Sequence, residues 1–187
     1  MRAKRQVLFV QGGGADTHDT WDNKLVASLQ HALGQSYEIL YPRMPNEAEP
    51  SYATWKMALD ALFETLRDGA FLVGHSVGAT ILLKALTEPR SARSFGAIIS
   101  IAAPFVGDGG WSSGELQFPT DLGTRLPKAL PIHFFHGLKD ETAPVSHVEL
   151  YANAIPQARV HRLPNRDHQL NNDLTEVAST ILSLEST

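Results

Sequence analysis

Short apolar runs alternate with amphipathic stretches along most of the chain. About six runs are rich in valine, isoleucine, leucine and phenylalanine and have the length of buried strands, and most end at glycine, proline or a polar turn. The expected strands are residues 6–10, 37–41, 71–74, 95–103, 131–136 and 158–163.

Between these runs, apolar residues recur at the spacing of one helix face. The expected helices are residues 22–33, a segment capped by Ser51 or Thr54 that runs to Leu66, a segment directly after residue 78, and residues 145–154 and 173–184. Strands that alternate with helices predict the α/β class, with a doubly wound parallel sheet of about six strands. Because no repeat or linker divides residues 1–187, we expect a single domain.

Composition removes several classes of function. A formal net charge of −4 over 187 residues gives no basic surface for nucleic acid or for an anionic membrane. The chain has no cysteine, which excludes disulfides, thiolate metal sites and a cysteine nucleophile. The apolar run at residues 7–10 is too short for a signal peptide or a membrane span. We therefore expect a cytoplasmic protein.

Residues 74–78 read Gly-His-Ser-Val-Gly and lie between an expected strand and an expected helix. Roughly one chain in twenty of this length would contain Gly-x-Ser-x-Gly by chance at average composition. The strand–turn–helix context, however, is that of a nucleophile elbow, in which a strained turn exposes the serine hydroxyl above the sheet. This pattern predicts Ser76 as the nucleophile and the Val77 amide as an oxyanion donor. The alternative is a glycine-rich turn without a catalytic role.

Three glycines, Gly12 to Gly14, follow the first expected strand. No Gly-Lys-Ser/Thr sequence follows, which excludes a Walker A loop, and Thr17 occupies the place of the last glycine of a dinucleotide fingerprint. In α/β-hydrolases the loop after this strand supplies the second oxyanion amide. We therefore predict Gly13 as that donor, with Gly14 as the second choice and a plain tight turn as the alternative.

Asp140 and His168 complete a Ser, Asp, His order that is typical of α/β-hydrolases. Both follow expected strands, and the carboxyl ends of parallel strands meet at one edge of the sheet. We predict that His168 accepts the proton of Ser76 and that Asp140 orients His168. The alternatives are Asp108 and Glu141 for the acid, and His75 and His161 for the base.

The long irregular segment at residues 105–130 follows the fourth expected strand. Loops of this length are usually functional. We predict that Trp111 and Phe118, together with Leu122, line an acyl pocket; the alternative is that they only anchor the loop. His133 and His136 lie three apart in a strand and point to opposite faces, so we predict no metal site and no cofactor.

In these motifs the chain resembles the small serine hydrolase family of the α/β-hydrolase superfamily, the group typified by retinoblastoma-binding protein nine. The Met-Pro-Asn loop and the helix start at Trp55 are more specific to this family than the elbow. The resemblance implies a lid-less α/β-hydrolase with a Ser–Asp–His triad that acts on small esters or amides. The matching segments span nearly the whole chain: residues 17–21, 41–46, 52–55, 73–78, 136–140 and His168.

Two positions depart from the common pattern. Gln11 stands where the superfamily commonly has histidine, so we expect different substrate contacts there. Asp167 stands where glycine is usual, which places an extra carboxylate near the base and changes the loop backbone.

The predicted function is hydrolysis of small carboxylic esters through an acyl-enzyme intermediate. One alternative is an amidase or peptidase with the same triad. The other is a protein-binding module that keeps the fold with little turnover, because fold does not fix function. The expected partner is a small-molecule ester or amide, and neither nucleic acid, membrane nor a protein partner is indicated.

Overall fold

Six parallel strands form one sheet in the computed structural model, which describes residues 3–88 and 94–185. The order across the sheet is β2-β1-β3-β4-β5-β6, so β1 lies inside the sheet and β2 and β6 form its edges. This arrangement confirms the predicted doubly wound α/β architecture. The strands are β1 (Arg5–Val10), β2 (Tyr37–Leu40), β3 (Ala70–His75), β4 (Phe95–Ile101), β5 (Ile132–Gly137) and β6 (Arg159–Leu163).

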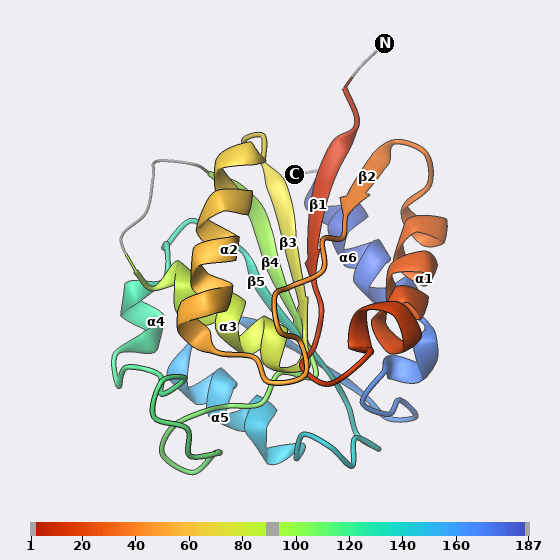
Figure 1. Cartoon of the computed structure of the whole chain (residues 1–187). Helices are drawn as coiled ribbons and strands as arrows, with labels where there is room; N and C mark the ends of the chain where they lie inside the picture. Colours follow the sequence, from red (N-terminus) through yellow and green to blue (C-terminus); the bar gives the residue numbers. More distant parts are fainter. Residues whose placement is uncertain (1–2, 89–93, 186–187) are drawn as a thin grey trace.

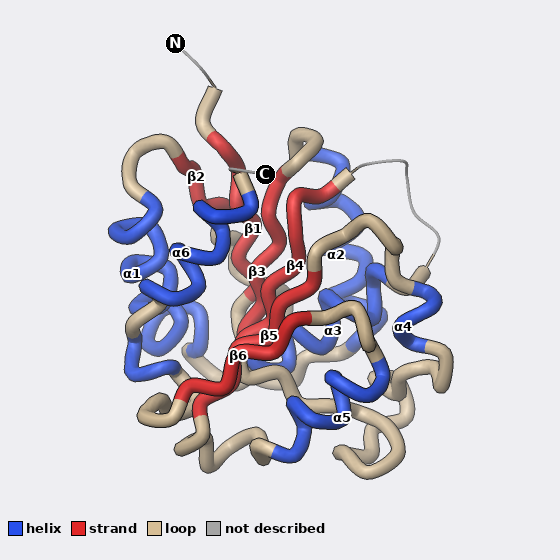
Figure 2. The backbone as a smooth tube through the Cα atoms, turned by 180° about the vertical axis from the view of Figure 1, so that it is seen from behind, coloured by secondary structure: helices blue, strands red, loops and turns tan. Residues whose placement is uncertain are grey.

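Helices cover both faces of the sheet (Figures 1 and 2). Helices α1 and α6 pack together on one face, and α2 and α3 pack together on the other face, which α5 also covers. The helices are α1 (Asn23–Leu33), α2 (Tyr52–Thr65), α3 (Ser76–Leu86), α4 (Leu122–Arg125), α5 (Ser146–Ala154) and α6 (Thr175–Leu184).

Alternating side chains of the central strands build two separate cores. In β3, Leu72 belongs to the core beneath α2, α3 and α5, whereas Phe71 and Val73 belong to the core beneath α1 and α6. Every residue of β3 is buried. A strand buried on both faces must be apolar throughout, which is why these strands appear in the sequence as continuous apolar runs.

The structure adds three short elements to those expected. A π-helical turn, η1 (Thr17–Asp22), precedes α1, so the helical region begins before residue 22. The short α4 interrupts the loop expected at residues 105–130. A 3-10 turn, η2 (Leu170–Asn172), lies between β6 and α6. The cap of α2 is Ser51, whose Oγ accepts a hydrogen bond from the Thr54 amide at 3.3 Å.

A helix that spans a lipid bilayer needs about 20 consecutive, mostly apolar residues. Across residues 3–88 and 94–185, no helix combines the length and the apolar character that crossing a membrane requires.

Candidate active site

The turn between β3 and α3 holds Ser76 in a strained backbone conformation. Its φ angle is 52°, in the left-handed region that residues with a side chain rarely adopt. Flanking glycines permit this turn, because a Cβ atom at Gly74 would lie 2.6 Å from the Cα of Ala79, and one at Gly78 would lie 1.9 Å from the Gln11 carbonyl oxygen. Ser76 is the first residue of α3, so the Val77 amide belongs to the first turn of that helix.

Three predicted side chains form one chain of hydrogen bonds at the carboxyl edge of the sheet. The Nδ1 atom of His168 donates to the Asp140 Oδ2 atom at 2.8 Å. The Nε2 atom of His168 lies 3.1 Å from the Ser76 Oγ atom, within reach to accept its proton. Of the alternative acids and bases, Glu141 is exposed and His161 instead pairs with His133 at 3.0 Å.

The environment of Asp140 keeps this carboxylate charged and fixed. Its Oδ1 atom accepts hydrogen bonds from the amides of Thr142 and Ala143, both at 2.8 Å. Burial raises the pKa of Asp140, but the hydrogen bond from His168 and these amides outweigh it, so the pKa lies below its ordinary value. His136 supports the same turn, because its Nε2–H donates to the Ala143 carbonyl at 3.0 Å.

The glycine loop after β1 lies directly against the elbow. A Cβ atom at Gly12 would lie 3.2 Å from the Ser76 Cβ, and one at Gly13 would lie 2.7 Å from a methyl carbon of Val77. The Gly12 amide donates to the Asp22 carboxylate at 2.7 Å, and the Gly14 amide donates to the Glu47 carbonyl at 2.6 Å. The amides of Gly12 and Gly14 therefore already have acceptors within the chain.

Gln11, which stands at the position where the superfamily commonly has histidine, binds neighbouring loops. Its side chain is buried, its Nε2 atom donates to the Glu47 carboxylate, and its Oε1 atom accepts from the Met44 amide at 3.1 Å. The same Glu47 oxygen accepts from the His18 amide at 2.9 Å. Gln11 and Glu47 therefore join the glycine loop to the Met-Pro-Asn loop.

The carboxylate of Asp167 likewise binds its own loop. Its Oδ1 atom accepts from the Asn171 amide at 2.7 Å, and the Asn171 side-chain oxygen accepts from the Asp167 amide at 3.1 Å. Three residues then follow with left-handed φ angles of 47°, 56° and 55°: Leu170, Asn171 and Asn172. The departure from glycine at position 167 thus builds a tight turn after the base.

Comparison with known proteins places this geometry in a family. A model of the alpha/beta hydrolase family matches residues 7–182, which is nearly the entire chain. The chain belongs to the alpha/beta hydrolase family. A hydrolase of this family commonly acts from a nucleophile elbow at the carboxyl edge of its sheet, where Ser76 lies.

The individual proteins similar to this chain share 30% sequence identity or less with it in the following comparisons. YdeN of Bacillus subtilis (strain 168), which is described as a hydrolase, is 30% identical over 98 residues, which is 52% of this chain and 50% of YdeN. The YdeN crystal structure matches with a TM-score of 0.75 at 22% identity and covers 98% of this chain and 100% of that chain.

Two further solved structures share the fold at low identity. The esterase domain of a Rhodothermus marinus protein has a TM-score of 0.64 at 19% identity, covering 100% of this chain and 87% of that one. XC6422 of Xanthomonas campestris, described as a serine hydrolase without a lid, has a TM-score of 0.63 at 19% identity, covering 100% of this chain and 83% of that one.

The structure places the two aromatic residues predicted for the substrate pocket of this hydrolase differently. Trp111 is 43% exposed, and its ring meets the His147 ring edge-on at 5.5 Å. Phe118 is buried and packs against Phe105 and Tyr151, with ring centroids 5.5 and 5.8 Å away. The position of Phe118 agrees with the alternative that it anchors the loop, whereas the ring of Trp111 is accessible.

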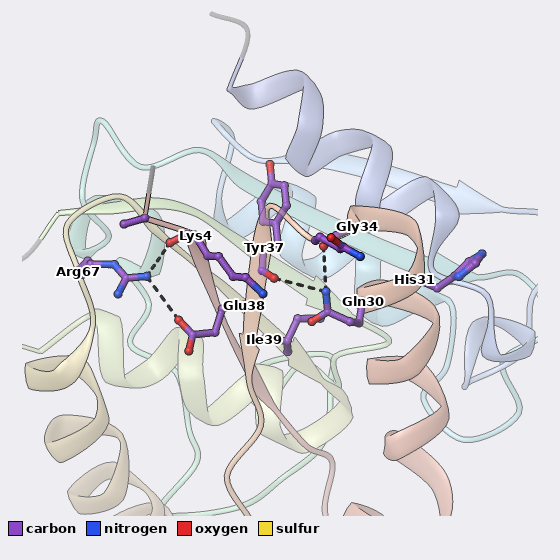
Figure 3. Close-up of a pocket in the computed structure, with 10 residues that line it drawn as sticks. Lys4, Gln30, His31, Gly34, Tyr37, Glu38, Ile39 and Arg67 are labelled. Atoms are coloured by element: carbon purple, nitrogen blue, oxygen red, sulfur yellow. Dashed lines mark hydrogen bonds and ion pairs between the residues drawn. The ribbon is translucent and has the colours of Figure 1, made fainter. Parts of the chain in front are cut away.

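Two hollows of the hydrolase lie at opposite ends of the strands, one near their carboxyl ends and one near their amino ends. One, of about 440 Å³, is lined by residues 15–16 and 43–48, beside the glycine loop. The other, of about 780 Å³, is lined by residues at the start of β1 and β2 and the end of α1, whose side chains Figure 3 shows. Its polar groups bind one another: Gln30 donates to the carbonyls of Gly34 and Tyr37, and Arg67 binds Lys4 and Glu38. Within the described ranges, no three His, Asp or Glu side chains are placed to hold a metal ion.

One functional candidate escaped the sequence analysis. Asp22 is fully buried and contacts the side chain of His75, next to the nucleophile. In the sequence it only marks the expected start of a helix, and its position gives no sign that the side chain turns inward.

Proposed function

We propose that this alpha/beta hydrolase is a serine hydrolase that cleaves small carboxylic esters through an acyl-enzyme intermediate. The observation that carries the proposal is the continuous hydrogen-bond chain from the strained Ser76 through His168 to the buried Asp140. It has the three parts that acyl transfer requires, namely a nucleophile, a base in reach of it, and an acid that fixes the tautomer of the base.

The geometry supports the following reaction. Ser76 Oγ attacks the carbonyl carbon of the ester while its proton moves to the Nε2 atom of His168. The tetrahedral intermediate then expels the alcohol, which takes that proton, and leaves an acyl-serine. Water attacks the acyl carbon, gives a proton to His168, and the released Ser76 oxygen recovers that proton as the carboxylic acid departs. Asp140 stays charged and stabilises each imidazolium.

Two backbone amides are proposed to stabilise the negative oxygen of each intermediate. They are the Gly13 amide in the glycine loop and the Val77 amide in the first turn of α3. Contact between the Gly13 position and the Val77 side chain supports a shared oxyanion site. Removal of one such donor typically slows the reaction by about 100- to 1,000-fold.

Esters are favoured over amides on one ground. The structural neighbours include an esterase domain. The resemblance to the small serine hydrolases typified by retinoblastoma-binding protein nine implies small substrates of either kind. The proposal also includes membership of this small serine hydrolase group, a role for Trp111 at the substrate and a cytoplasmic location. The amidase alternative uses the same groups and is separated by substrate.

A fluorophosphonate probe tests the nucleophile directly, with the adduct located by mass spectrometry. We expect covalent modification at Ser76, lost in Ser76→Ala and reduced by about 10⁴-fold or more in His168→Ala, because the base is absent. Ser36→Ala and His31→Ala are matched controls, because both residues are exposed at the opposite edge of the sheet. Both controls should label as the wild type does.

Paired substrates then separate the reaction classes. Short-chain esters and amides with the same acyl group should show ester turnover at least tenfold above amide turnover. A folded wild type that is neither labelled at Ser76 nor active on either substrate would refute the proposal and favour the binding module.

A further inference from the structure

A second pair of acid and histidine lies behind the triad. Asp22, the last residue of η1, and His75, the last residue of β3, are 0% and 1% exposed. The Nδ1–H of His75 donates to Asp22 Oδ2 at 2.9 Å, and its Nε2–H donates to the backbone carbonyl of His168 at 3.0 Å. Since both ring nitrogens face acceptors, both carry protons, and His75 is an imidazolium paired with a carboxylate.

The surrounding charges maintain this protonation state. Burial lowers the pKa of His75, but the Asp22 carboxylate outweighs it, and Asp140 also acts to raise it, so the pKa lies above its ordinary value. Burial raises the pKa of Asp22, but the charge and hydrogen bond of His75 and the Gly12 amide outweigh it. The third titratable neighbour is His168, whose ring centroid lies 4.9 Å from that of His75.

The pair binds three of the four segments that the proposed reaction uses. Asp22 Oδ2 accepts from the Gly12 amide at 2.7 Å, and Asp22 Oδ1 accepts from the Gln169 side chain at 3.3 Å. His75 belongs to the elbow itself and reaches the carbonyl of the base. Through these bonds the glycine loop, the elbow and the base loop share one buried anchor.

We propose that the Asp22–His75 ion pair positions the base: His75 holds the main-chain carbonyl of His168 and thereby sets the place of its imidazole relative to Ser76 Oγ. This inference rests on the proposed serine hydrolase function. The ring of His168 moves with its backbone, and the 3.1 Å separation from Ser76 Oγ leaves little tolerance. A displacement of about 1 Å at such a site lowers the rate by about 100-fold.

Two substitutions of His75 divide its hydrogen bonds. The amide nitrogen of asparagine lies near the position of Nδ1, and that of glutamine lies near the position of Nε2. His75→Asn therefore keeps the donor to Asp22 and loses the donor to the His168 carbonyl. His75→Gln keeps the donor to the His168 carbonyl and loses the donor to Asp22. Both remove the imidazolium charge equally, so the two variants differ in which of the two hydrogen bonds they keep.

We expect His75→Asn to lower kcat for an ester, and the fluorophosphonate labelling rate of Ser76, by about 10- to 100-fold, with KM within about threefold of the wild type. His75→Gln should retain kcat within about fivefold of the wild type. Urea unfolding should rank the two variants in the opposite order, because His75→Gln leaves the buried Asp22 with one donor fewer. Asp19→Asn is the control, since Asp19 is an exposed carboxylate of the same turn and should react as the wild type does.

Histidine NMR tests the pair without using activity. At pH 7 the wild type should show both nitrogens of His75 protonated, and the Nδ1–H signal of His168 should shift in His75→Asn and remain in His75→Gln. A neutral His75, equal kcat in the two variants, or a slower His75→Gln would overturn the inference. If wild-type Ser76 does not react, the proposed function fails, whereas the NMR signals still decide whether His75 is charged and whether it places His168.

Discussion

At the scale of single residues, the turn that carries Ser76 depends on the two glycines that flank it. Ser76 takes its left-handed conformation only because Gly74 and Gly78 leave room for Ala79 and for the Gln11 carbonyl. Position 78 has less room for a Cβ atom than position 74, because that atom would meet the main-chain carbonyl of Gln11, which leads into the glycine loop. A change there affects stability and the proposed oxyanion site together.

Gly78→Ala should lower the free energy of unfolding by about 1 to 3 kcal/mol and slow fluorophosphonate labelling, because its Cβ atom would push against the Gln11 carbonyl. Urea unfolding and labelling rates measure the two effects. Gly114→Ala is the matched control, since a Cβ atom there meets nothing within 4 Å. Wild-type stability and labelling in Gly78→Ala would show that the loop after β1 yields at this point.

The sequence predicted the residues of the triad but not those that support it. Ser76, Asp140 and His168 could be found because each follows a strand in the order typical of α/β-hydrolases. Whether they catalyse stays a prediction. Asp22 and Glu47 could not be found, because only the folded chain turns their carboxylates toward the elbow and the glycine loop. At Gln11 the sequence predicted only that substrate contacts would differ from those of the usual histidine, and the bonds of its side chain to Glu47 and Met44 appear only in the fold.

At the scale of elements, side chains hold the loops of the site to neighbouring helices. Arg166, just before the base, donates to Asp173 at 2.7 Å and to Glu176 of α6 at 2.9 Å. On the other side of the sheet, the Trp55 indole of α2 donates to the Pro45 carbonyl in the Met-Pro-Asn loop at 2.7 Å. Each contact couples a catalytic-edge loop to a packed helix.

The contact between Arg166 and Asp173 makes the stability of the fold depend on pH. Hydrogen bonds from Thr175 and Arg166 lower the pKa of Asp173 to about 2 from an ordinary value of 3.8. Because the folded value is the lower one, the stabilisation is complete above about pH 5 and is lost as the pH falls toward 2. Urea unfolding from pH 6 to pH 2 should therefore show the difference between wild type and Asp173→Asn shrinking with acid. A difference that stays constant over this range would contradict the assigned shift.

The hydrogen bond from the Trp55 indole to the Pro45 carbonyl predicts a loss of stability when this donor is removed. Trp55→Phe should lower the free energy of unfolding by about 2 to 4 kcal/mol, because it leaves the Pro45 carbonyl without its donor and creates a cavity. Met57→Ala on the same helix is the control, since Met57 is 74% exposed and should change stability by less than about 0.5 kcal/mol. Equal effects of the two substitutions in urea unfolding would refute the role of the indole.

Long periodic elements were predictable, and short ones were not. The strands and the helices from α1 to α6, apart from α4, lie where apolar spacing placed them, with ends that move by a few residues. The π-helical turn η1 and the left-handed turn at residues 170–172 carry no such period. Both are fixed by tertiary contacts, such as those of Asp22 with His75 and of Asp167 with Asn171.

At the scale of the whole molecule, the parallel sheet places loops from distant parts of the chain at one edge. The order β2-β1-β3-β4-β5-β6 places the glycine loop and the elbow at the ends of adjacent strands, β1 and β3. Asp140 and the base loop follow β5 and β6 at the other side of the sheet. The alpha/beta hydrolase fold could be predicted because strand and helix alternation fixes it, whereas the pocket walls could not, because they lie in loops.

The separation of the triad along the chain has a consequence for protein synthesis. Ser76 and His168 are 92 positions apart, and the base follows the last strand of the sheet. While the ribosome is still making β5, the nascent chain contains Ser76 but neither Asp140 nor His168, and while it is making β6 the chain still lacks His168. Under the proposed mechanism, Ser76 therefore cannot be activated before β6 and the loop that carries His168 have been made.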